Sequence, residues 1–124
     1  MEKSKSRRGT IIFENENGIL LARTGSDERL MLPGGHANHN EPRIMAAIRE
    51  LHEETKLRAY DVKFLFDFES NSYFHKVFLI KAHGEPVASP PEITFIDYYH
   101  PEKTNIYHSS VRMIEKYLKM KDQQ

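Results

Sequence analysis

Short blocks of apolar residues, separated by polar turns, run through the first third of the chain. Residues 10–23, TIIFENENGILLAR, contain two apolar runs around the polar stretch Glu14–Gly18. Asn and Gly tolerate the positive φ angles of tight turns, so this segment predicts a β-hairpin. Residues 29–35, RLMLPGG, predict a short strand that Pro33 and two glycines stop.

Three later segments also predict strands, because aromatic and β-branched residues are concentrated in them. They are DVKFLFDFES (61–70), YFHKVFLIKAHG (73–84) and ITFIDYY (93–99). Asn71 and Ser72 lie between the first two segments, which predicts a second hairpin.

Two segments have helical patterns. Residues 42–56 begin with Pro42, which suits the first turn of a helix because its missing N–H costs nothing there. Near the C-terminus, apolar residues recur at helical spacing over residues 111–118, and Ser109 or Ser110 is the expected N-cap.

The order of strands, helix, strands and helix indicates a layered α/β (α+β) domain with mixed sheet pairing. The length of 124 residues predicts that 1–124 form a single domain, and no internal repeat or linker interrupts them. Residues 1–8 are polar, and we expect them to be flexible.

Composition excludes several classes of protein. The chain carries 18 basic and 18 acidic residues, so no overall charge attracts a nucleic acid or an anionic membrane. The absence of cysteine excludes disulfides and thiolate catalysis, and the apolar runs are too short to cross a bilayer. We expect a cytoplasmic protein with no membrane partner.

Glutamates are concentrated in GGHANHNEPRIMAAIRELHEETKL (34–57). On a helical wheel with about 100° per residue, Glu50, Glu53 and Glu54 form an arc about 100° wide. The arc borders an expected buried face made of Ile44, Ala47, Ile48 and Leu51. Like charges at these spacings repel, and a hard cation such as Mg²⁺ would remove the repulsion because it prefers carboxylate oxygens. A solvated acidic face and a metal site both fit the helix alone.

The residues before the helix favour the metal site. Glycines at 34–35 let the backbone approach a ligand closely and leave carbonyl oxygens free to coordinate it. Counting from Gly35, Glu41 follows after five residues, and the run Arg49–Leu57 begins after seven more. This spacing resembles the Nudix box, and the last fixed glycine of that motif is the one position that differs, being Lys56 here.

The resemblance implies a fold and an activity. The fold is a mixed sheet sandwiched between helices. The activity is hydrolysis of a nucleoside diphosphate linked to another group, with Mg²⁺ or Mn²⁺ as cofactor and a small nucleotide as substrate.

The resemblance also assigns roles to residues of this segment. Metal ligands are expected at Gly35, Glu50, Glu53 and Glu54. Glu53 or Glu50 would be the general base, Arg49 would orient the glutamates through salt bridges, and Glu41 would hold the loop or the Arg49 side chain. Lys56 occupies a position where glycine usually ends the helix in a left-handed conformation, and lysine there costs roughly 1 kcal/mol relative to glycine.

Five positions are candidates for substrate contacts or for a further acidic role. Substrate contacts are expected at Arg23, Gly34, Gly35 and His36, and Glu92 resembles an additional acidic residue that some members use as metal ligand or base. A surface arginine, a solvated histidine and a solvated loop glutamate are the alternative interpretations.

The substrate stays open among several nucleotides. A (deoxy)nucleoside triphosphate cleaved to the monophosphate and pyrophosphate is the first expectation. A dinucleoside polyphosphate or an RNA 5′ end is the alternative, and only the latter would make nucleic acid a partner. A weakly active nucleotide-binding module and an unrelated Mg²⁺- or Ca²⁺-binding domain are the competing hypotheses. The sequence allows either a monomer or a homodimer.

Overall fold

The computed structural model describes residues 5–123, which form the α+β structure predicted from the sequence. In chain order its elements are β1 (Ser6–Ile12), β2 (Glu14–Asn15), β3 (Gly18–Thr24), β4 (Gly34–His36), α1 (Arg43–Thr55), β5 (Arg58–Glu69), β6 (Tyr73–His83), β7 (Ile93–Tyr98) and α2 (His108–Asp122). Within residues 5–123, neither helix is long and apolar enough to cross a membrane.

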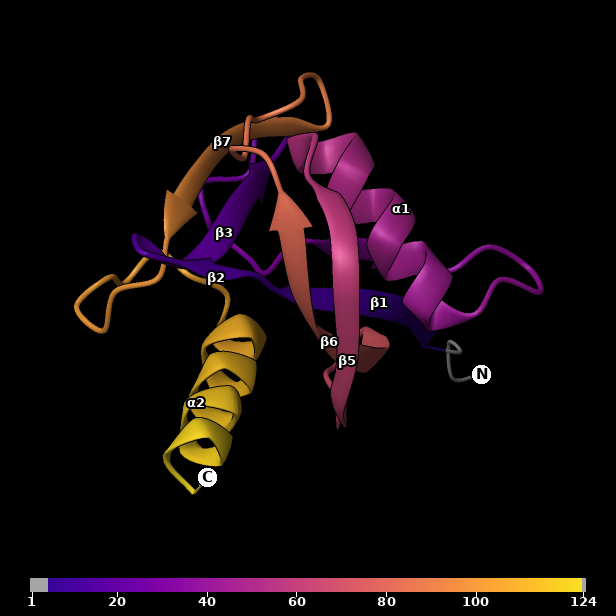
Figure 1. Cartoon of the computed structure of the whole chain (residues 1–124). Coiled ribbons are helices and arrows are strands. Elements are labelled where there is room, and N and C mark those ends of the chain that lie inside the picture. Colours follow the sequence, from indigo (N-terminus) through magenta and orange to yellow (C-terminus); the bar gives the residue numbers. More distant parts are fainter. Residues whose placement is uncertain (1–4, 124) are drawn as a thin grey trace.

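The strands form two sheets (Figure 1). The first is mixed, in the order β4-β1-β6-β5: β1 is antiparallel to β4 and parallel to β6, and β5 and β6 form the predicted hairpin. The second is antiparallel, in the order β2-β3-β7. The expected mixed sheet is therefore confirmed, and a smaller antiparallel sheet accompanies it.

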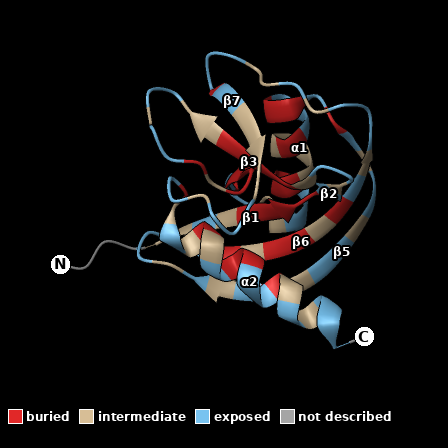
Figure 2. Ribbon diagram, turned by 90° about the vertical axis from the view of Figure 1, so that its left-hand side faces the viewer, coloured by how far each residue is buried: buried red, intermediate tan, exposed pale blue. Residues whose placement is uncertain are grey.

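The two helices cover opposite faces of the mixed sheet. Neighbouring residues of a strand point to opposite faces, so Ile11 and Ile12 of β1 enter different core clusters. Ile11 belongs to the cluster that contains Leu51 of α1, and Ile12 belongs to the cluster that contains Ile114 of α2. The buried side of α2 is turned towards the sheet (Figure 2). The sandwich implied by the resemblance is confirmed.

Gly9 brings α1 into contact with the backbone of β1. A Cβ at this position would lie 2.4 Å from the Arg43 carbonyl oxygen and 2.8 Å from the Ala47 amide nitrogen, both in α1. The helix can occupy this space only because glycine has no side chain. Gly9 is also paired with Gly35 of β4, so this contact helps to set how closely α1 approaches the two site glycines.

Two strand predictions in the first third of the chain were correct only in part. The hairpin expected over residues 10–23 is present as the short β2–β3 pair, but β1 is not part of it, because the chain leaves the mixed sheet after Ile12 and β1 pairs with β4 and β6. Leu30 and Met31 form isolated bridges, and the strand begins at Gly34. A Cβ on Gly34 would lie 2.2 Å from the Gly9 carbonyl oxygen, so glycine permits this pairing and does not end it.

The expectation that residues 1–8 are flexible was wrong for Ser6–Arg8. These residues begin β1 and pair with Tyr73–His75 of β6, so ladder hydrogen bonds hold them despite their polar composition. Residues 1–4 lie outside the described part of the chain.

Details of both helices also differ from the predictions. Ile44 was expected on the buried face of α1, but it is 38% exposed. The buried face is rotated towards the glutamates, because α1 meets β1 at Arg43 and Ala47. The N-cap of α2 is Tyr107 and not a serine, and the hydroxyl of Ser110 instead accepts the Leu32 N–H at 3.0 Å.

Lys56 ends α1 in the left-handed conformation that glycine usually adopts at this position of the motif. Its φ is 66° and its ψ is 2°, and its N–H donates to the His52 carbonyl at 2.9 Å. Asn40 also has a positive φ, of 64°. The missing motif glycine therefore leaves the exit geometry of the helix unchanged at the cost of backbone strain.

Replacing Gly9 by alanine should destabilise the fold. The added methyl group meets helix backbone, which cannot move aside as a side chain can, so we expect Gly9→Ala to lower the free energy of unfolding by about 1–3 kcal/mol. Gly25→Ala is the matched control: its φ is +51° but no atom lies within 4 Å, so it should cost about 1 kcal/mol at most. Urea denaturation measures both, and equal losses would contradict the contact argument.

Replacing Lys56 by glycine should stabilise the fold. Glycine removes the strain of the left-handed conformation, while its freedom in the unfolded chain offsets part of the gain, which leaves about 0.5–1 kcal/mol. Asn40→Gly is the comparison, and it should gain less because asparagine tolerates this region better than lysine. Thermal unfolding of the two variants would refute the explanation if Asn40→Gly gained as much.

Candidate functional site

Glu54 is a buried carboxylate in the last turn of α1. It is 5% exposed, and both of its carboxylate oxygens face the Gly34 N–H, at 3.3 and 3.4 Å. Burial, with a contribution from the negative charge of Glu50, raises the pKa of Glu54 to about 8, although the positive charge of Arg8 opposes the shift. The protein therefore holds this carboxylate where negative charge is poorly compensated.

Glu50 and Glu53 lie at different depths beside it. The side chain of Glu50 is 18% exposed and lies against Gly35, where a Cβ would come within 2.4 Å of the Glu50 carboxyl carbon. Burial raises the pKa of Glu50. Glu53 is 47% exposed at the side chain. The arc on the helix thus runs from solvent at Glu53 to the interior at Glu54.

Arg49 connects three carboxylates and the strand end. Its guanidinium donates to Glu50 at 2.7 Å, to Glu41 at 2.9 and 3.0 Å and to the more distant Glu53 at 3.4 Å. It also donates to the His36 carbonyl at 3.2 Å. A planar fork of donors suits such multiple carboxylate contacts.

Glu41 anchors this arrangement to the loop before α1. Its carboxylate accepts hydrogen bonds from the Arg49 side chain and from the Asn38 N–H at 2.9 Å. The Arg49 hydrogen bonds, followed by that of Asn38, lower the pKa of Glu41 to about 2. Glu41 therefore stays ionised and holds both the loop and Arg49.

The side chains present fit a hard divalent cation. Glu50, Glu53 and Glu54 offer only oxygen donors, and the raised pKa values of Glu50 and Glu54 indicate a local excess of negative charge that a cation would relieve. Within residues 5–123, no three acidic or histidine side chains already converge as a ligand set. Arg49 explains part of this, because it engages Glu50 and Glu53.

The charge of Glu92 affects the pKa values of these glutamates, whereas that of Arg23 does not contribute to them. The negative charge of Glu92, in the exposed turn before β7, contributes to the raised pKa of Glu50 and of Glu54. Arg23, in β3, lies over the ring of Phe95 at 4.9 Å and does not line the cavity described next. Glu92 thus belongs to the acidic region, and Arg23 does not contact the three glutamates.

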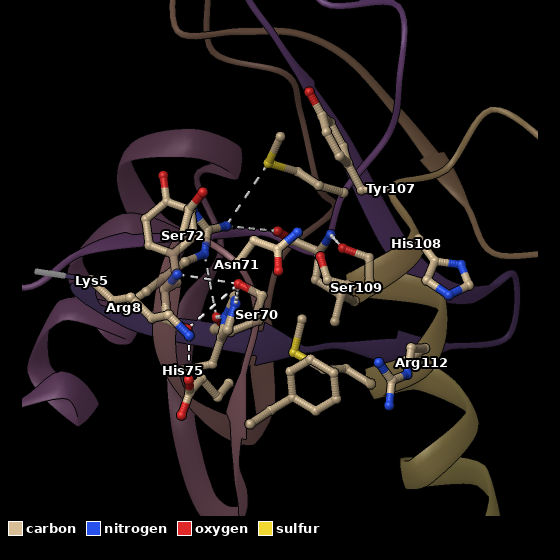
Figure 3. Close-up of a pocket in the computed structure, with 18 of the residues that line it drawn as sticks. Lys5, Arg8, Ser70, Asn71, Ser72, His75, Tyr107, His108, Ser109 and Arg112 are labelled. Carbon is tan, nitrogen blue, oxygen red and sulfur yellow. Dashed lines mark hydrogen bonds and ion pairs between the residues drawn. The ribbon is translucent and has the colours of Figure 1, made fainter. Parts of the chain in front are cut away.

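A cavity of about 740 Å³ opens on the α2 side of the mixed sheet (Figure 3). Arg8 and His75 come from the sheet, Ser70 from the β5–β6 turn, and Ser109 and Arg112 from the beginning of α2. None of the three glutamates of α1 lines this cavity. Its volume is in the range of small-molecule sites.

Arg8 lies at the boundary between the cavity and the glutamates. It donates to the Leu32 carbonyl at 3.0 Å, and two residues later the Gly34 N–H meets Glu54. Burial lowers the pKa of Arg8, while the negative charges of Glu54 and Glu50 oppose that shift. The glutamate cluster and the cavity therefore share a wall, the segment 32–34.

Comparison with known proteins decides the family. The model of the NUDIX domain matches residues 3–117. The chain belongs to the Nudix family. It is thus a Nudix hydrolase, of a family that acts on pyrophosphate bonds and generally uses divalent metal ions.

Solved structures agree with this assignment. A protein assigned to the Nudix hydrolase family in Chromobacterium violaceum is 33% identical, with a TM-score of 0.86 over 96% of this chain and 80% of that one. A MutT Nudix hydrolase from Burkholderia pseudomallei is 20% identical, with a TM-score of 0.74 over 91% of this chain and 98% of that one. An ADP-ribose pyrophosphatase from Streptococcus suis is 16% identical, with a TM-score of 0.66 over 86% and 83%. No curated protein matches the sequence.

Sequence reasoning missed two residues that shape this Nudix site. Arg8 was weighed as a contact for a polyanion, but a flexible basic tail was favoured, and Gly9 was not singled out. The available signal was the position of both residues directly before the apolar run of residues 10–13, which already predicted a strand. The partner strand β6 lies too far away in sequence for any local pattern to reveal it.

The floor of the cavity contains a buried neutral histidine. Thr10 Oγ1 lies 2.7 Å from His75 Nδ1, and Ser70 Oγ lies 3.0 Å from His75 Nε2. Arg8 Nε donates to Thr10 Oγ1 at 3.3 Å, so the threonine hydroxyl can donate in turn to His75. Burial, and then the positive charge of Arg8, lower the pKa of His75 to about 4.

The pKa of His75 predicts a pH dependence of stability. An unfolded histidine titrates near about 6.5, so between pH 6.5 and 4 unfolding takes up a proton, and stability falls as the pH is lowered. We expect His75→Gln to reduce this slope by up to about 1.4 kcal/mol per pH unit.

Urea denaturation at several pH values between 4 and 6.5 measures the slope. His39→Gln, at an exposed loop position, is the matched control and should keep the wild-type slope. Identical slopes for the two variants would contradict the assignment of this pH dependence to His75.

Proposed function

We propose that this Nudix hydrolase is a Mg²⁺-dependent pyrophosphohydrolase of nucleoside diphosphate derivatives. The observation that carries the proposal is the position of Glu50 and Glu54, held at the Gly34–Gly35 strand end with raised pKa values. Burial opposes the ionised form of both carboxylates, and a bound cation would restore it; the family supplies the expectation that this cation is divalent.

Glu50, Glu53 and Glu54, with the Gly35 carbonyl, would hold the ion or ions, and Glu92 is close enough to add its charge. Bound Mg²⁺ or Mn²⁺ would neutralise the diphosphate oxygens and acidify a water molecule. Arg49 keeps Glu50 and Glu53 oriented through its salt bridges.

The proton transfer is assigned to a glutamate of the same helix. The oxygen of the attacking water forms a bond to phosphorus, its proton passes to the carboxylate, and the bridging oxygen leaves with the departing phosphate. Glu53 is the most exposed of the three, and its contact with Arg49, at 3.4 Å, is longer than that of Glu50, at 2.7 Å; Glu50 is the other candidate. The side chain of His36 is exposed at the end of β4, where a substrate contact stays a prediction.

Nucleotides are the substrates to test first, beginning with (deoxy)nucleoside triphosphates. Dinucleoside polyphosphates, ADP-ribose and RNA 5′ ends complete the panel, since the solved relatives include a MutT hydrolase and an ADP-ribose pyrophosphatase. Identities of 16–20% with those two proteins support the fold alone. The two proteins therefore indicate which substrates to assay, but they do not identify the substrate of this chain.

A weakly active nucleotide-binding module is the second hypothesis. Its expected mark is the loss of a glutamate from the motif, and all of Glu50, Glu53 and Glu54 are present. An unrelated metal-binding domain with a chance match would lack a strand, a loop and a helix over residues 30–56, whereas β4 and α1 lie there. A cytoplasmic location stays a prediction.

Replacing the glutamates should abolish hydrolysis without loss of the fold. We expect Glu53→Gln and Glu54→Gln to lower kcat/KM by about 100-fold or more for any substrate that the wild type cleaves, because each removes a charge needed for metal binding or proton transfer. Glu115→Gln, at an exposed position of α2, is the matched control and should behave as the wild type.

Thermal unfolding in a metal-free buffer separates lost chemistry from lost structure. Glu54→Gln should melt at or above the wild-type temperature, since it removes a buried carboxylate with a raised pKa. Full activity in both glutamate variants would overturn the metal site, and the absence of any turnover by the wild type would favour the binding module.

A further inference from the structure

The lining of the cavity of about 740 Å³ has an excess of cationic side chains, which have no role in the catalytic proposal. Its described lining includes the cationic side chains of Lys5, Arg8, Arg29 and Arg112, against one carboxylate, Glu69, which already pairs with Lys5. The chain as a whole is neutral, so this local excess is not a consequence of composition. A cavity lined in this way favours an anionic ligand.

The three arginines differ in their free donor groups: Arg8 already donates to Thr10 Oγ1 and to the Leu32 carbonyl, whereas the side chains of Arg29 and Arg112 donate to no other residue in the described part of the chain. Each lies over an aromatic ring: Arg8 over Tyr73 at 5.4 Å, Arg29 over Tyr107 at 4.3 Å, and Arg112 over Phe68 at 5.5 Å. Stacking engages the face of a guanidinium and leaves its N–H groups, which lie in the plane, free to donate. Among the described residues, none of the three arginines forms an ion pair with a carboxylate.

The arginines come from different parts of the fold. Arg8 lies on β1 at one side of the cavity, and Arg112 lies on α2 at the opposite side (Figure 3). The first turn of α2, which also lines the cavity, has no acidic residue and no side-chain cap. Its backbone N–H groups therefore add partial positive charge to that of the arginines.

We infer that this cavity binds a substrate nucleoside whose ribose carries a phosphate group in addition to the diphosphate that is cleaved. The inference rests on the proposed function, because the wall shared through Arg8, Leu32 and Gly34 joins the cavity to the glutamates. Arg8 donates to the shared segment at the Leu32 carbonyl, so in this assignment it serves the diphosphate, and Arg29 and Arg112 remain for a second phosphate. Guanidinium groups are the side chains best suited to phosphate oxygens.

Two kinds of substrate carry such a phosphate. A small nucleotide can carry it as a monoester on the 2′ or 3′ oxygen, and an RNA 5′ end carries it as the diester to the next nucleotide. The shared chemistry is a ribose phosphate, and the choice of ligands separates the two sources.

Calorimetric titration in EDTA at low ionic strength tests the inference without metal and without turnover. The probes are adenosine 5′-monophosphate, adenosine 2′,5′-bisphosphate, adenosine 3′,5′-bisphosphate and the 5′-phosphorylated dinucleotide pApA. The two bisphosphates differ from the monophosphate only by the added ribose phosphate, so the contribution of the base cancels between them, whereas pApA also adds a second adenosine. We expect at least one of the three to bind tenfold or more tightly than the monophosphate, and the preference to shrink at high salt.

Substitutions on the two sides of the cavity locate the effect. Arg112→Gln and Arg29→Gln, each exposed and on a different segment, should each reduce the preference several-fold. Lys119→Gln removes an exposed positive charge from the same helix outside the cavity, and it should leave the preference unchanged. Thermal unfolding checks that all three variants are folded.

The outcomes separate this inference from the proposed function. If one of the bisphosphates binds most tightly, the site is assigned to small nucleotides. If pApA binds most tightly, the site is assigned to RNA 5′ ends. Equal affinity for all four probes, no measurable binding, or an equal effect of Lys119→Gln would overturn the inference, even if the enzyme hydrolyses unphosphorylated substrates. A preference that depends on the arginines in an enzyme without hydrolytic activity would instead overturn the proposed function.

Discussion

The approach of α1 to the backbone of β1 at Gly9 determines where the acidic side chains lie. Any side chain at this position would displace the helix, because its Cβ would overlap the Arg43 carbonyl and the Ala47 amide. The contact turns the glutamate side of α1 towards the sheet, which buries Glu54 and places Glu50 against Gly35. The position of the acidic cluster on one helix thus depends on a glycine in a different element.

Local sequence patterns predicted most of the helices and strands, but they did not predict which strands distant in sequence pair with one another. The β5–β6 hairpin and both helices follow from residue type and spacing, and the motif located the acidic arc. The pairing of β1 with β6 joins residues that are distant in sequence, so the apolar run of residues 10–13 was assigned to the nearest alternative, a hairpin with β3. The buried face of α1 was misplaced at Ile44 for a related reason: a helical wheel assumes that apolar residues face the sheet, and here the closest contact is made by backbone.

Charge is segregated in this neutral chain. One side of the segment 32–34 holds carboxylates whose pKa values are raised, and the other side holds arginines stacked on aromatic rings. Arg8 lies between them. Its positive charge opposes the rise in the pKa of Glu54, and it adds to the effect of burial in lowering the pKa of His75. This single guanidinium couples the two regions, although a composition summary would describe the surface as balanced.

The parallel pairing of β1 with β6 also has a consequence for the order of folding. Ser6, near the beginning of the chain, lies opposite Tyr73, and the hairpin of β5 and β6 can form from local contacts before that distant pairing is made. Contacts of such sequence separation are slow to form because the entropy of closing the loop is lost first. On the ribosome, β1 and α1 emerge before the strand that completes their sheet. Gly9 and the glutamates therefore reach their final arrangement only after more than half of the chain has been synthesised.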